Sequence, residues 1–74
     1  MRPTKEQMKE TGKMLRQLRG IRTRRGVSKE TGISYSALAF YENGERNPSG
    51  RVKKILADYY GLPVEVIFYT HENY

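Results

Sequence analysis

The sequence predicts an all-α fold, a compact bundle of about five short helices. Two observations predict it. Apolar residues recur at spacings of three and four along several segments, which is the period of an amphipathic helix. Serine, threonine, glycine or asparagine separates these segments, and such residues begin and end helices. We expect one domain over residues 1–74, with a core of about 11–68, a basic polar segment at 1–10 and a loose tail at 69–74.

Composition narrows the class of protein. The 74 residues contain no cysteine, which excludes disulfides and thiolate metal sites. The sequence shows neither an apolar run of membrane-spanning length nor a signal peptide, so we predict a cytoplasmic protein. The net charge is +6, and the first thirty residues carry ten basic against three acidic side chains. This excess is compatible with a polyanionic partner and also with a merely solvated basic surface.

The first ten residues leave two alternatives open. Thr4 and Gln7 have the spacing of a capping box, so a helix could begin there. A frayed basic arm, with Arg2, Lys5 and Lys9 available to phosphates or a minor groove, is equally compatible.

Residues 11–19 form the first predicted helix. Met14, Leu15 and Leu18 supply its apolar positions, and Gly20 ends it.

Residues 23–48 are the organising stretch. Thr23 suits the N-cap of a short helix over 24–31, which Gly32 ends. Ser34 caps a second helix that runs to about Glu42. Ser28 is a small residue, and Gly32 follows it by four positions. The apolar Leu38 follows Gly32 by six positions. This is the signature of a helix-turn-helix.

The stretch GISYSALAFYENGERNPS resembles the lambda-repressor/Cro-like (XRE) helix-turn-helix family. LRQLRG upstream and LADYYGLPVEVIF downstream are similar to the first and the last two helices of that family. The resemblance covers residues 12–68. Three residues depart from the family pattern: Ser28 stands for alanine, Thr31 for a larger apolar residue, and Gly26 interrupts the first helix of the motif.

The resemblance implies DNA binding and gives several side chains a role. It implies an ion pair between Arg19 and Glu42, for which two independent surface charges are the alternative. It also implies that Arg24, Arg46 and Asn47 hold DNA phosphates, and the alternative for the two arginines is a solvated charge. Two further cations near Arg24 in the sequence, Arg22 and Arg25, are also predicted to hold phosphates.

The helix over 34–42 is the predicted recognition helix. Leu38 and Tyr41 are expected to face the core. Apolar side chains on the opposite face of this helix would contact thymine methyl groups, which favours A·T-rich half-sites. The alternative for Phe40 is that it covers the core. The residues expected to face the bases are Tyr35, Ser36, Ala39 and Phe40.

Two helices follow. Ser49 caps the first, over 50–60, whose apolar stripe is Val52, Ile55, Leu56 and Tyr59, with Lys53 and Lys54 off the stripe.

Residues 62–68 fit a strand or a helix by pattern alone, and the resemblance decides for a short last helix. Leu62 and Ile67 would point inward, and Val64, Phe68 and Tyr69 would be available for a dimer contact.

No arrangement of residues typical of an enzyme, a cofactor site or a metal site is apparent, and His71 is the only histidine. We therefore predict a non-enzymatic regulator of transcription, Cro-like or repressor-like. It would bind double-stranded DNA as a homodimer without a cofactor. The alternative is a protein-binding module, such as an antitoxin-like partner or co-regulator.

Overall fold

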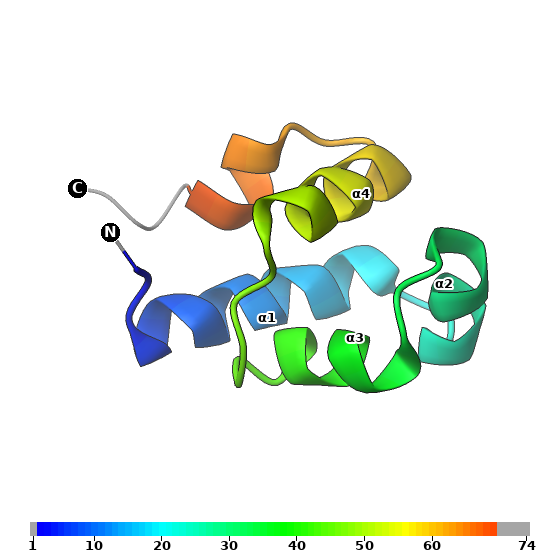
Figure 1. Ribbon diagram of the computed structural model, residues 1–74, viewed down its shortest axis with the longest axis horizontal. Coiled ribbons are helices and arrows are strands. Elements are labelled where there is room, and N and C mark those ends of the chain that lie inside the picture. The colour runs from blue at the N-terminus through cyan, green and yellow to red at the C-terminus, as the bar shows by residue number, and fades with distance from the viewer. Residues whose placement is uncertain (1, 70–74) are drawn as a thin grey trace.

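The computed structural model describes residues 2–69, which fold into four α-helices and one turn of π-helix (Figure 1). The described residues contain no strand, so the predicted all-α class is confirmed. The expectations for residues 70–74, His71 included, lie outside the described residues. None of the helices within 2–69 is long and apolar enough to cross a membrane. The elements are α1 (Lys5–Arg19), α2 (Arg24–Thr31), α3 (Tyr35–Glu42), α4 (Gly50–Tyr60) and η1 (Glu65–Tyr69).

The N-terminal alternative is decided in favour of the helix. The Gln7 amide donates to the Thr4 hydroxyl at 3.1 Å, and the Thr4 amide donates to the Gln7 side-chain oxygen at 2.7 Å. This reciprocal capping box starts α1 at Lys5, so most of the predicted polar segment is helical.

The other predicted caps are present as well. The hydroxyls of Thr23, Ser34 and Ser49 each accept a hydrogen bond from the amide three residues later. Gly26 does not interrupt α2, because its amide is the donor to Thr23 and the helix continues through it.

The core lies between α1 and the other helices. Its buried members come from α1, α2, the turn after α2, α3, α4 and η1, so every element contributes to one cluster. In the view of Figure 1, α1 runs through the middle of the molecule, with α3 below it and α4 above it. The buried apolar residues are Leu15, Val27, Ile33, Leu38, Leu56, Ala57, Ile67 and Phe68.

Two glycines allow α1 to approach α3 at backbone distance. A Cβ on Gly12 would lie 2.3 Å from the carbonyl oxygen of Glu42, and one on Gly44 would lie 2.8 Å from the Cα of Lys9. Any side chain at Gly12 would therefore push α3 away from α1. This contact therefore helps to set the position of α3.

The prediction of an exposed Phe68 is wrong. Its side chain is 2% exposed and belongs to the core, next to Ile67. The last turn is a π-helix, whose i→i+5 bonding gives a wider turn than the predicted helix. This turn places both Ile67 and Phe68 against the bundle. Val64 is half-buried and Tyr69 is 40% exposed, so they stay near the surface.

Lys53 also differs from expectation, because it is buried rather than off the apolar stripe of α4. Its Nζ donates to the Tyr69 hydroxyl at 3.2 Å and lies 4.5 Å from the centre of that ring and 5.6 Å from the centre of Phe68. Two aromatic faces stabilise the cation while its alkyl stem packs on apolar surface. The buried side of α4 is therefore Lys53, Leu56 and Ala57.

Candidate nucleic-acid interface

Helix α3 has an inner and an outer side. Leu38 and Glu42 on the inner side are each 3% exposed, and Tyr41 packs against the core. The outer side consists of the four residues predicted to face bases, at positions that share one face of a helix. Two of them are exposed and two are half-buried, and none belongs to or packs against the core cluster. They are Tyr35, Ser36, Ala39 and Phe40.

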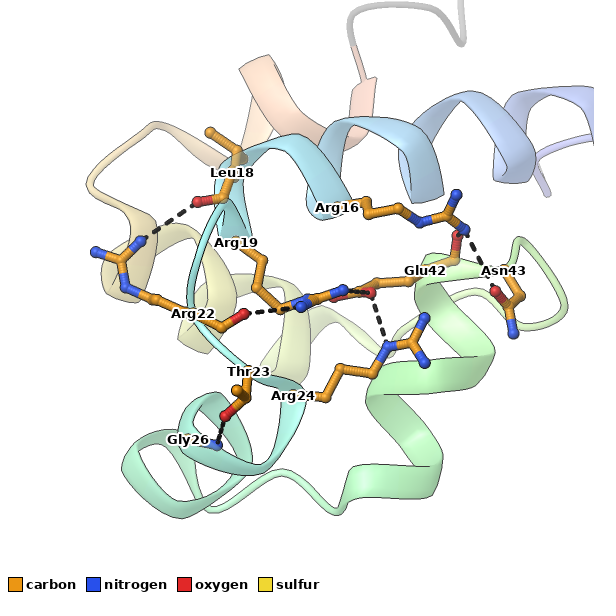
Figure 2. A network of polar contacts seen from close by, with 9 residues as sticks. All are labelled: Arg16, Leu18, Arg19, Arg22, Thr23, Arg24, Gly26, Glu42 and Asn43. Atoms are coloured by element: carbon orange, nitrogen blue, oxygen red, sulfur yellow. Dashed lines mark hydrogen bonds and ion pairs between the residues drawn. The ribbon is translucent and has the colours of Figure 1, made fainter.

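The carboxylate of Glu42 joins three elements on the inner side (Figure 2). Arg19 donates to both of its oxygens, from Nε to Oε2 at 2.8 Å and from Nη2 to Oε1 at 3.0 Å. Arg24, the first residue of α2, donates from Nε to Oε1 at 2.9 Å. The Arg16 guanidinium donates to the Glu42 carbonyl oxygen at 3.1 Å and to the side chain of Asn43 at 3.3 Å. One buried acid thus ties α1, α2 and α3 together.

The structure places the Arg19–Glu42 pair where the family resemblance implies it. The Glu42 side chain is 2% exposed and that of Arg19 is 17% exposed, so the pair is shielded from water. Removing one partner of such a pair leaves a buried charge without its counter-ion, which is strongly destabilising.

Arg24 has a second role that the sequence does not predict. Its hydrogen bond to Glu42 raises the pKa of its guanidinium above the ordinary value, and the Tyr35 hydroxyl acts in the same direction. Arg24 is therefore part of the scaffold that fixes α3. Only the Nε of Arg24 donates to Glu42, so the N–H groups of its two terminal nitrogens can donate hydrogen bonds to a phosphate.

The Arg22 guanidinium contacts α1 and α4. Its Nη1 donates to the carbonyl oxygen of Leu18 at 3.4 Å, and its guanidinium lies 5.7 Å from the centre of the Tyr59 ring. In Figure 2 its side chain points away from α3. The Tyr59 hydroxyl donates to Glu30 in turn, so this group links the α1–α2 loop, α2 and α4.

The N-terminal end of α3 borders an open basic hollow of about 530 Å³. Arg25 is exposed there, with its guanidinium 6.0 Å from the centre of the Tyr35 ring. Ile21, in the loop before α2, is fully exposed at the same place. The side chains lining the hollow include Arg19, Ile21, Arg22, Arg24, Arg25 and Tyr35.

The loop after α3 carries Arg46 and Asn47, which are both exposed. The Arg46 guanidinium carbon lies 4.2 Å from the centre of the Phe40 ring. Phe40 is half-buried, although it does not belong to the core cluster. The residue spacing does not predict this contact, and the signal for it in the sequence is a cation in the loop that follows an aromatic residue outside the core.

Cations thus lie at both ends of α3, and hydroxyl and apolar groups lie between them. Such an arrangement can neutralise phosphates on both sides of a groove and place small apolar groups against base edges.

Comparison with known proteins agrees with this description. The family model for the helix-turn-helix matches residues 13–67, which is most of the chain. No curated protein and no solved structure matches the chain.

Proposed function

Because this chain belongs to the lambda-repressor/Cro-like (XRE) helix-turn-helix family, a DNA-binding family, we propose that it regulates transcription by sequence-specific binding to duplex DNA. Helix α3 enters the major groove with its outer side toward the bases. The observation that carries the proposal is the division of α3 into a side fixed by the core and Glu42 and a side that makes no core contact.

Phosphate contacts supply affinity in this proposal. Arg25 at the start of α2 and Asn47 after α3 are exposed at opposite ends of the recognition helix. Arg24 adds the terminal nitrogens that Glu42 does not use. Such contacts release counter-ions, so binding weakens steeply as salt concentration rises.

Base contacts supply selection. Ser36 is exposed and can donate to or accept from base edges, while Ala39 and Phe40 offer apolar groups to thymine methyls. Tyr35 is 49% exposed at the first position of α3, where its hydroxyl reaches a phosphate or a base. The half-site is therefore expected to be rich in A·T pairs.

We further propose that the protein acts as a homodimer in a Cro-like or repressor-like manner. One α3 reads only a half-site, so two copies on a near-palindrome would place two half-sites about one helical turn apart. With Phe68 buried, the exposed apolar residues of the last turn are Val66, at 36%, and Tyr69, at 40%. These two residues and Val64 are the proposed contact between copies. A monomer in sedimentation velocity, both alone and on operator DNA, would contradict it.

The proposal is tested by fluorescence anisotropy with labelled duplexes over a range of salt concentrations. We expect Arg25→Ala to weaken binding to all sequences alike and to reduce the salt slope by about 1. Lys54→Ala, which removes an exposed cation from α4 on a different part of the surface, is the matched control and should leave the slope unchanged. A folded wild-type protein that binds no duplex would overturn the proposal and favour the protein-binding alternative.

A further inference from the structure

The outer side of α3 lacks a strong reader of base edges. Its four residues include no arginine, asparagine or glutamine, which are the side chains that form bidentate pairs with guanine or adenine. A guanidinium from the loop after the helix lies against this side. Arg46 lies over Phe40 at 4.2 Å, the shortest cation–ring distance among the described residues.

The Arg46 side chain is held by this ring and not by an acid. Within residues 2–69 its guanidinium forms no ion pair, although Glu45 is its neighbour in sequence. Contact with a ring face uses the flat surface of a guanidinium, and its N–H donors lie in the plane and point outward. The stack therefore restrains the side chain while its donors remain available.

The location of the ring decides what those donors can meet. Phe40 is on the outer side of α3, outside the core cluster, one helical turn after Ser36. A phosphate contact needs only a cation at the edge of the interface. A guanidinium resting on a base-facing ring is instead restrained beside the base edges, and its ordering cost is paid before DNA binds.

We propose that Arg46, held over Phe40, reads the O6 and N7 atoms of a guanine in the major groove, next to a thymine whose methyl group packs on Phe40. This rests on the proposed DNA-binding function and replaces the phosphate contact that the sequence predicts for Arg46. The half-site then contains one fixed G·C pair adjoining its A·T-rich part. Phe40 acts as the platform and Arg46 as the specificity-determining residue.

The test uses Arg46→Met, which keeps an unbranched side chain to cover Phe40 and removes every guanidinium donor. Wild-type protein and variant are used to select duplexes from a random library, and affinities are then measured on the selected site with each base pair replaced in turn. Circular dichroism verifies that the variant is folded. Lys54→Met serves as the control for loss of one exposed cation.

For wild type we expect replacement of the guanine to weaken binding about 10-fold or more. For Arg46→Met the same replacement should change affinity less than about 2-fold, while preferences at the A·T positions persist. Lys54→Met should retain the guanine preference.

Two results would overturn the inference alone. One is a wild-type site without a fixed guanine. The other is an Arg46→Met protein that binds all sequences more weakly by the same factor and has a smaller salt slope, which identifies a phosphate contact. Failure of folded wild-type protein to bind any duplex is a different result, because it removes the proposed function together with this inference.

Discussion

The two sides of α3 differ in how their residues are held. On the inner side, Leu38 packs in the core and Glu42 bonds two arginines, so each is fixed by partners from other helices. On the outer side, Ser36 is exposed, and Phe40, which is outside the core cluster, has the Arg46 guanidinium over its ring. The inner side sets where the helix lies, and the outer side is left for a ligand.

This difference implies that folding and DNA recognition can be separated by mutation. Changes on the inner side should lower stability, and DNA binding should be lost only because the helix is displaced or unfolded. Changes on the outer side should leave the fold intact and alter which sequences are bound. Substitutions on each side of α3 test this separation.

Glu42→Ala should destabilise the protein most, by about 3–5 kcal/mol, because Arg19 and Arg24 lose their common counter-ion in a shielded site. Urea denaturation followed by circular dichroism measures the change. Glu45→Ala removes an exposed acid three residues later and should change stability by less than about 0.5 kcal/mol. Equal effects of the two substitutions would mean that the Glu42 network contributes little to the fold.

Leu38→Ala and Phe40→Ala compare the two sides directly. Leu38 is 3% exposed, so its truncation should cost about 2–5 kcal/mol in unfolding free energy. Phe40→Ala removes a larger side chain yet should cost much less, since that ring lies outside the core. Its main effect should be reduced discrimination between duplexes in a competition binding assay. A Phe40→Ala protein as unstable as Leu38→Ala would place Phe40 on the inner side.

Gly12→Ala tests the close approach of α1 to α3. The added Cβ would meet the backbone of Glu42 at 2.3 Å, and backbone cannot rotate away, so we expect a loss of about 1–3 kcal/mol. Gly50→Ala, in the first turn of α4 with no atom within 4 Å of its Cβ, should instead stabilise by about 0.4–1 kcal/mol. Thermal denaturation of the two variants should show a lower melting temperature for Gly12→Ala and a higher one for Gly50→Ala than for wild type. A stabilising Gly12→Ala would contradict the close contact.

Tyr60→Phe should give the smallest effect, confined to high pH. Burial, with the negative charge of Glu42 adding to it, raises the pKa of Tyr60 from 10.0 to about 12. Folding therefore favours the protonated phenol. The contribution of the protonated Tyr60 phenol to the free energy of unfolding is complete below pH 10 and is lost as the pH rises through 12. The variant should lose less stability than wild type between these values. A wild-type tyrosine titration without a component near pH 12 would contradict it.

The parts of the fold predicted from sequence are those determined locally. Thr23 and Ser34 cap their helices through amides three residues away, and Gly32 ends α2 with a positive φ of 79°. These interactions depend on residues within one turn of the chain, so composition and spacing are sufficient to identify them. The division of α3 into inner and outer residues follows from its helical period in the same way.

The parts that were missed depend on contacts between distant residues. Phe68 is buried because the last turn is π-helical, and no pattern in a five-residue segment distinguishes that turn from an ordinary helix. Lys53 is buried with its ammonium group against two aromatic residues of η1, in a different element of the fold. The sequence predicts a phosphate contact for Arg24 but not its bond to Glu42, because that bond spans 18 residues and joins two helices. Such pairings are tertiary and cannot be read from local spacing.

We propose above all that the outer side of α3 reads duplex DNA. Selection of binding sites from a random duplex library by the wild-type protein, at about 150 mM salt, tests it most directly. We expect enrichment of a two-fold symmetric, A·T-rich motif whose half-sites lie about one helical turn apart. If a folded, helical protein enriches no motif from the library, this result would contradict the proposal and would assign the exposed side of α3 to a different partner.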